Sequence, residues 1–118
     1  MKIYVAHTKD FDFHDELYAP IRASELNKQH EFILPHEGSG NTLSRDIIKG
    51  CDLFVAEISH PSTSLGIEIG WADAFGVPVI AMRKPGANEP WWHQDICKVS
   101  FEYEDAEDMV EKLTRNID

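Results

Sequence analysis

The feature that most constrains the fold is a continuous apolar run in the middle of the chain. The segment CDLFVAEIS at 51–59 contains LFVA and lacks the alternation of a strand with one face in water. Such a strand is buried on both faces, as in a parallel sheet covered by helices. Further short apolar segments predict four companion strands, at 2–8, 31–36, 77–83 and 97–103.

Helical patterns lie between these predicted strands. They span 14–28, 42–49, 64–75 and 105–116. Pro20 interrupts the first and predicts a kink or a delayed start. Thr42 is a possible cap of the second, and Gly76 ends the third. The segment KPGANEPWWHQD, before the last strand, predicts a long loop.

The alternation of strands and helices predicts one domain over residues 1–118. Its fold class is α/β, a three-layer flavodoxin-like or Rossmann-like sandwich around a five-stranded parallel sheet. Right-handed crossovers make 2-1-3-4-5 the simplest strand order. In that order the switch point lies between the first and third strands, and ligands bind there, outside the carboxyl ends of the strands.

Composition excludes several classes of partner. The formal net charge is −10, from 21 acidic and 11 basic residues, which disfavours a nucleic-acid polymer but leaves room for a small nucleoside or nucleotide. No apolar run approaches the ~20 residues of a membrane span, and the first residues lack the apolar stretch of a signal peptide. Cys51 and Cys97 form no disulfide framework, and the histidines have no zinc spacing. We therefore expect a cytoplasmic protein without a metal.

The predicted topology brings polar residues together at the switch point. The first strand ends in His7 and Thr8, and the third ends in SHPS at 59–62, which includes Pro61 and Ser62. Glu68 follows early in the next helix, among apolar residues and between Gly66 and Gly70. Glycines there allow a ligand or another backbone to come close. A carboxylate in this place either complements the helix dipole, lies on a solvated face, or does chemistry in the crevice.

The segment CDLFVAEISHPSTSLGIEIGWADAFGVPVIAM resembles the core of the nucleoside 2-deoxyribosyltransferase family, which includes the 2'-deoxynucleoside 5'-phosphate N-hydrolases. The family pattern is a strand, then Pro-Ser, then Gly-x-Glu-Leu-Gly opening a helix. IYVAHT and DELYAPI add weaker similarity. The resemblance implies that Glu68 is the nucleophile that attacks the anomeric carbon of a 2-deoxyribosyl group and forms a covalent glycosyl-enzyme. It implies no cofactor, and a homodimer or higher homo-oligomer.

The resemblance also implies roles for residues around Glu68. Ser62 matches a substrate-binding position, although a serine there also suits a helix cap. Tyr4 matches a tyrosine near the nucleophile, although a strand tyrosine is more often part of a core. Thr8 matches a small hydroxyl residue in the following turn.

The chain departs from the family pattern at three positions. The aspartate that helps protonate the leaving base aligns with Ser44. Asp46 lies two residues further on and can take this role if the helix is shortened, so we expect Asp46 or Ser44 to assist the leaving base. The arginine that holds the phosphate in the N-hydrolases aligns with Asp10, which favours a nucleoside over a nucleotide. Ser64 replaces the first glycine before the nucleophile.

Other functions remain open at this point. The chain is interpreted as an enzyme that cleaves or transfers an N-glycosidic bond, with a catalytically inactive nucleoside- or nucleotide-binding protein as the alternative. A signalling module on the same fold and a hydrolase for another N-glycoside are further possibilities. The loop before the last strand contains side chains that either stack on a base, complete a dimer contact or pack against the edge of the core. The candidates are Asn88, Trp91, Trp92 and His93.

Overall fold

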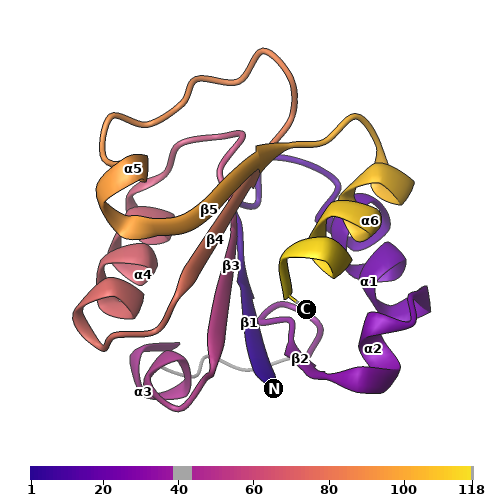
Figure 1. The fold of residues 1–118 in the computed structure, drawn as a ribbon, viewed down its shortest axis with the longest axis horizontal. Coiled ribbons are helices and arrows are strands. Elements are labelled where there is room, and N and C mark those ends of the chain that lie inside the picture. The colour runs from indigo at the N-terminus through magenta and orange to yellow at the C-terminus, as the bar shows by residue number, and fades with distance from the viewer. Residues whose placement is uncertain (39–43, 118) are drawn as a thin grey trace.

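The computed structural model describes residues 1–38 and 44–117. Five strands form one sheet in the order β2-β1-β3-β4-β5 (Figure 1). Every neighbouring pair in this sheet is parallel. The α/β class and the 2-1-3-4-5 order predicted from the sequence are confirmed. The strands are β1 (Lys2–Ala6), β2 (Glu31–Ile33), β3 (Leu53–Glu57), β4 (Val79–Arg83) and β5 (Cys97–Glu102).

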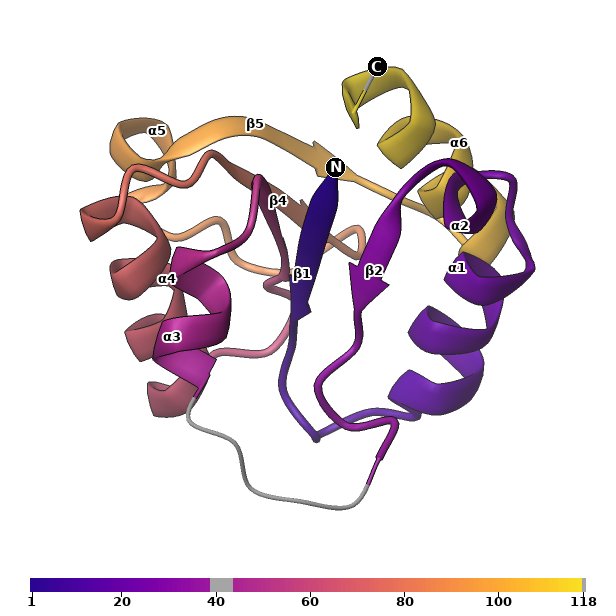
Figure 2. The ribbon, with the colours of Figure 1, turned by 90° about the horizontal axis from the view of Figure 1, so that it is seen from below.

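Helices cover both faces of the sheet. The first group contains η1 (His14–Tyr18, a π-helix), α1 (Ala19–Ala23), α2 (Leu26–Gln29) and α6 (Ala106–Ile117). The second group contains α3 (Ser44–Lys49), α4 (Thr63–Ala74) and α5 (His93–Ile96). Figure 2 shows α3, α4 and α5 on one side of the sheet, and α1, α2 and α6 on the other.

Three local predictions need correction or comment. The helix predicted over 14–28 is divided into η1, α1 and α2, because Pro20 lies at the start of α1 and Ser24 leaves the helical conformation at its end. The loop predicted before β5 contains the short helix α5. Thr42, the predicted cap of α3, lies outside the described residues.

The sheet separates two apolar cores, as its alternating side chains require. Ile3 and Val5 of β1 face the core under η1, α1, α2 and α6, and Tyr4 and Ala6 face the core under α3 and α4. All five residues of β3 are buried, so the burial predicted from LFVA is confirmed.

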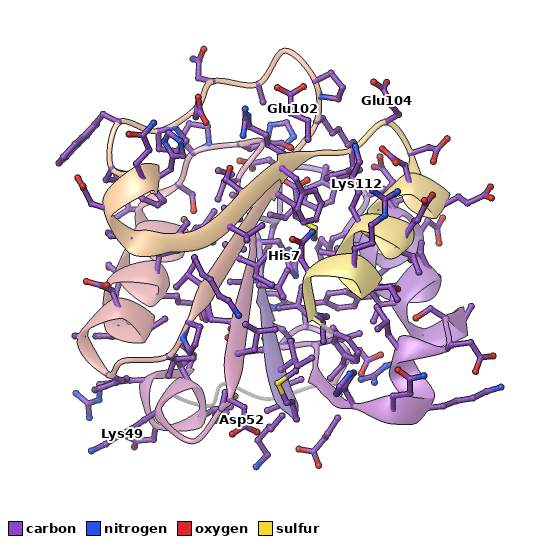
Figure 3. The ribbon with its side chains drawn as sticks, viewed as in Figure 1. His7, Lys49, Asp52, Glu102, Glu104 and Lys112 are labelled. Atoms are coloured by element: carbon purple, nitrogen blue, oxygen red, sulfur yellow. The ribbon has the colours of Figure 1, made fainter. Side chains whose placement is uncertain are left out.

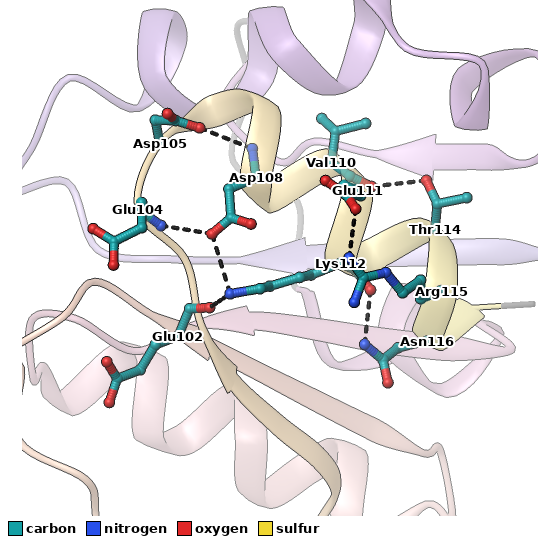
Figure 4. Close-up of polar contacts among 10 residues, drawn as sticks. All are labelled: Glu102, Glu104, Asp105, Asp108, Val110, Glu111, Lys112, Thr114, Arg115 and Asn116. Carbon is teal, nitrogen blue, oxygen red and sulfur yellow. Dashed lines mark hydrogen bonds and ion pairs between the residues drawn. The ribbon is translucent and has the colours of Figure 1, made fainter.

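The helix predicted over 105–116 is confirmed as α6, and it is amphipathic. Met109 and Leu113 of α6 are fully buried, and its polar side carries ion pairs one helical turn apart (Figure 4). Lys112 Nζ lies 3.1 Å from Asp108 Oδ2 and donates to the Glu102 carbonyl at 2.7 Å, which ties α6 to β5.

The two ends of the sheet differ, because only the carboxyl ends of the strands border the cavity of about 830 Å³. Figure 3 shows Lys49 and Asp52 at the amino-terminal edge of the sheet, opposite Glu102 and Glu104 at the carboxyl edge. At the amino-terminal end, the Lys2 amide donates to Asp52 Oδ2 at 2.8 Å, and this hydrogen bond joins the start of β1 to the residue before β3. The carboxyl ends of β1, β2 and β3 instead lead into turns that border a cavity.

Candidate active site

A cavity of about 830 Å³ lies at the carboxyl ends of β1 and β2, next to β3. Its size is in the range of small-molecule sites. The turn after β1 and the segment after β2 form one side, and α3 and α4 form the other. This is the switch point of the sheet, where the predicted order places a ligand.

Helix α4 presents Glu68 to this cavity because of its position in the helical repeat. Ser62 is the N-cap, and its Oγ accepts a hydrogen bond from the Leu65 amide at 3.1 Å. Residues three, four and seven positions apart share a face of a helix. The cavity face carries Ser64, Ile67, Glu68 and Trp71. The opposite face buries Leu65, Ile69 and Ala72 against the sheet.

Glu68 is held by a tyrosine from β1. The Tyr4 hydroxyl donates to Glu68 Oε2 at 2.6 Å. Tyr4 is 1% exposed, and its ring stacks on Phe54 of β3 at a centroid distance of 5.6 Å. Burial, and then the Glu68 carboxylate, raise the pKa of Tyr4 well above its usual range, so its hydroxyl stays a donor at all ordinary pH values. Glu68 is therefore an oriented, half-buried carboxylate and not a solvated surface residue.

A buried histidine holds the turn after β1. His7 Nδ1 lies 2.6 Å from the Thr8 carbonyl, and Nε2 lies 2.6 Å from the Tyr18 hydroxyl. The His36 amide donates to the same hydroxyl at 3.1 Å. The carbonyl only accepts, so we assign the proton of a neutral ring to Nδ1, and Tyr18 donates to Nε2. Burial lowers the pKa of His7 to about 4, which agrees with a neutral ring.

A buried carboxylate outside the cavity holds the turn between β3 and α4. Glu57 is 1% exposed and accepts from the Ser59 amide at 2.6 Å, from the Ser59 hydroxyl at 3.0 Å, and from the Tyr103 hydroxyl. The Lys84 amide donates to Ser59 Oγ at 2.8 Å. This network joins β3, β4 and the segment after β5 beneath the turn that leads to Ser62.

The structure brings most of the predicted site residues together. Those that line the cavity are Tyr4, His7, Thr8, Ser44, Ser62 and Glu68. Asp46 does not line it, because residues two apart on a helix face different directions and the cavity face of α3 carries Ser44 and Ile47. The Asp46 side chain is 77% exposed and lies 3.6 Å from Arg45 Nε.

Pro61 and Gly66 line a second cavity of about 380 Å³ on the other side of Ser62. Trp92 and Asn88 also border it, and Trp92 packs against the core under α4. Trp91 is 88% exposed, so the adjacent tryptophans have different environments. His93 Nε2 lies 2.6 Å from Glu89 Oε1.

Sequence reasoning missed several cavity residues. Trp71 lies three residues after Glu68 and could have been found from the helical repeat. Lys9 and His36 border the cavity from the turns after β1 and β2. No spacing links these two residues, because the parallel sheet alone brings them together.

The described residues contain neither a metal-ligand group nor a membrane-spanning helix. Within residues 1–38 and 44–117, no three His, Cys, Asp or Glu side chains are grouped as metal ligands would be. None of the helices described has the length and apolar character needed to cross a membrane.

Comparison with known proteins identifies relatives of this chain. A protein of Syntrophotalea carbinolica, named "Putative 2'-deoxynucleoside 5'-phosphate N-hydrolase 1", is 39% identical over 56 residues. The match spans 46% of this chain and 39% of that protein's length. No family model matches the chain.

Solved structures share the fold over nearly the whole chain. The Clostridium botulinum CMP N-glycosidase BcmB has a TM-score of 0.75 at 24% identity, covering 98% of this chain and 99% of its own. A conserved protein from Enterococcus faecalis V583 has a TM-score of 0.68 at 18% identity, with 98% of each chain covered. The sequence match and the shared fold together confirm that the chain resembles the nucleoside 2-deoxyribosyltransferase family, which includes the 2'-deoxynucleoside 5'-phosphate N-hydrolases.

Proposed function

We propose that this protein is an N-glycosidase that cleaves the bond between the base and the sugar of a 2'-deoxynucleoside-like substrate. The observation that carries the proposal is the Tyr4–Glu68 pair, an oriented carboxylate 2.6 Å from a buried hydroxyl at the border of the switch-point cavity. The names of the sequence relative and of BcmB, an N-hydrolase and an N-glycosidase, support this class of reaction.

The reaction proceeds in two displacements at the anomeric carbon. The Glu68 carboxylate forms a bond to this carbon while the bond to the base nitrogen breaks, and the base leaves with the electron pair and takes up a proton. Water then attacks the same carbon, gives a proton to solvent, and releases the Glu68 carboxylate. One water molecule is consumed, and one free base and one free sugar are formed.

Tyr4 has the role of orienting the nucleophile. The Tyr4 hydroxyl donates a hydrogen bond to Oε2 of Glu68, and this bond fixes the orientation of the carboxylate relative to the cavity. A positioned nucleophile needs less reorganisation on the way to the transition state. Because Tyr4 keeps its proton, it also withdraws charge from the carboxylate once the glycosyl ester breaks.

The leaving base must take up a proton. Asp46 was the predicted acid, but its exposed carboxylate lies outside the cavity, whereas Ser44 lines it. We assign the proton to solvent at the open mouth of the cavity, with Ser44 as a hydrogen-bonding group. The position of Asp46 also favours the second candidate function, a nucleoside- or nucleotide-binding protein without turnover.

Water is proposed as the acceptor because the names of the two proteins, an N-hydrolase and an N-glycosidase, describe cleavage of a bond and not transfer of a group. Transfer to a second base remains an alternative. The predicted homo-oligomer stays a proposal as well. The cytoplasmic location and the single domain remain predictions.

The test is base release from the four 2'-deoxynucleosides, their 5'-monophosphates and CMP, measured by chromatography with and without a free acceptor base. We expect release from at least one substrate, and we expect Glu68→Gln to abolish it. Stimulation by an acceptor base would indicate a transferase. Binding without release, in folded protein, would replace the enzyme by the binding protein.

A further inference from the structure

The second cavity, of about 380 Å³, has no lysine, arginine, aspartate or glutamate among the described residues that line it. It lies beside the segment that joins β4 to α5, which extends beyond the carboxyl ends of the strands (Figure 1). Charged residues make up 27% of the chain, and the switch-point cavity contains Lys9, Asp10 and Glu68. Because the burial of a charge without a partner is costly, the second cavity favours a neutral ligand.

The walls of the second cavity combine an aromatic ring with aliphatic side chains. Leu65 and Ile69 come from the buried face of α4, and the half-buried Trp92 is the N-cap of α5. Gly66 leaves the backbone of α4 bare, since a Cβ added there would meet no atom outside the neighbouring turns of the helix within 4 Å. An indole ring beside aliphatic side chains and bare backbone suits a planar aromatic molecule.

Two polar side chains at the second cavity have no protein partner. In the part of the chain that the structure describes, the Asn88 amide and the His60 ring form no hydrogen bond. An amide offers both donors and an acceptor, and a neutral imidazole offers one of each. The edges of nucleobases carry donors and acceptors side by side, and amide side chains pair with them. These groups therefore fit a neutral heteroaromatic ring.

Hydrogen bonds fix the backbone around the second cavity. The buried Glu57 accepts from the amide and the hydroxyl of Ser59, which lines the cavity. Ser59 Oγ accepts from the Lys84 amide at 2.8 Å, and this bond ties the segment after β4 to the turn after β3. At the far end of that segment, the Pro90 carbonyl accepts from the His93 amide at 3.2 Å. The fold therefore sets the shape of the cavity.

We propose that the second cavity binds a free nucleobase. The choice of ligand rests on the proposed function, because cleavage of an N-glycosidic bond releases a base that is neutral near neutral pH. Ser62, the N-cap of α4, lines both cavities, so the base is released next to the second one. The base stacks on the Trp92 ring, and its edge bonds to the Asn88 amide. No covalent step is involved, and the sugar remains in the switch-point cavity with Glu68.

The three tryptophans of the chain can report on the two cavities separately. Trp71 lines the switch-point cavity, Trp92 lines the second cavity, and Trp91 is 88% exposed. Their indole N–H signals in ¹H–¹⁵N NMR spectra, assigned with Trp→Phe variants, are followed during titration with adenine, cytosine and thymine. We expect at least one base to shift the Trp92 signal saturably and to leave the Trp91 signal in place. We expect 2-deoxyribose to leave the Trp92 signal unchanged.

Variants then test the contacts, with affinity measured by calorimetry. Asn88→Ala should weaken base binding by about twofold to tenfold, the effect of one neutral hydrogen bond. Trp92→Leu should weaken it by about fivefold to a hundredfold, the effect of one base–aromatic stack. Trp92 packs against the core, so its replacement can lower stability, whereas Asn88 is exposed and its replacement should not. Trp91→Ala is the matched control and should leave the affinity unchanged.

The binding measurement needs no turnover, so it separates this inference from the proposed function. Base release without a response of Trp92 to any base would overturn the second site and leave the glycosidase intact. A saturable response of Trp92 without base release would support the site although the proposed reaction fails. A response of Trp71 alone would place the base in the switch-point cavity and overturn the proposal. A Trp92 signal that moves only on dilution of the protein would also overturn it, because a second copy would then cover the cavity.

Discussion

Replacing Tyr4 by phenylalanine tests how much the orientation of Glu68 contributes to catalysis. The substitution removes one hydroxyl, the donor at 2.6 Å from Glu68 Oε2, and keeps the ring that stacks on Phe54. A hydrogen bond to a charged group contributes about 1.5–3 kcal/mol. We therefore expect kcat/KM for base release to fall by roughly tenfold to a hundredfold.

The stability of Tyr4→Phe separates orientation from unfolding. Phenylalanine leaves no unpaired donor, and Glu68 is half-buried and can bind water instead. The free energy of unfolding in urea should then fall by less than about 1.5 kcal/mol. Tyr103→Phe is the matched control, since Tyr103 is also a buried tyrosine that donates to a carboxylate, Glu57. It should lose more stability than Tyr4→Phe, because the buried Glu57 carboxylate cannot bind water in exchange, but less activity. A Tyr4→Phe enzyme within twofold of wild type would refute the proposed role of this pair.

Two further predictions concern pH and the leaving base. Burial lowers the pKa of His7 from 6.5 to about 4, so the unfolded chain binds more protons between these values, and stability that is complete above about pH 6.5 should be lost as the pH falls toward 4. The effect amounts to at most about 3 kcal/mol, and the melting temperature of His7→Gln between pH 4 and 7 should depend less steeply on pH than that of wild type. Equal slopes would contradict the neutral, buried His7. Asp46→Asn should change kcat for base release by less than about twofold, because the Asp46 carboxylate is 77% exposed and outside the cavity. A loss of tenfold or more, at unchanged stability, would restore Asp46 as the acid.

The sequence predicts the fold because its apolar runs and its helix-limiting residues both indicate the same alternation of buried strands and helices. The run LFVA requires burial on both faces, and β3 is buried at every residue in the centre of the sheet. Ser62 and Gly76 set the limits of α4, with a cap at one end and a left-handed glycine after the other. Once these limits hold, the helical repeat places Glu68 on the cavity face.

The remainder of the site depends on contacts that no local pattern encodes. Lys9 and His36 meet because β1 and β2 are neighbours, although 27 positions separate them in the chain. Glu57 lies at the end of a strand in the sequence pattern, and no local pattern predicts that Tyr103, from beyond β5, donates to this buried carboxylate. Asp46 was a candidate only because it lies two residues beyond the aligned Ser44, and the direction of its side chain follows from the phase of α3, which the sequence leaves open.

The most direct test of the account is to look for the covalent intermediate on Glu68. Wild type is mixed with the best substrate, quenched in acid within the first turnover, digested, and analysed by peptide mass spectrometry alongside Glu68→Gln. The account predicts a glycosyl group on the peptide that contains Glu68, and no adduct and no base release with Glu68→Gln. An adduct on another residue, or base release by Glu68→Gln at a rate comparable to wild type, would contradict it.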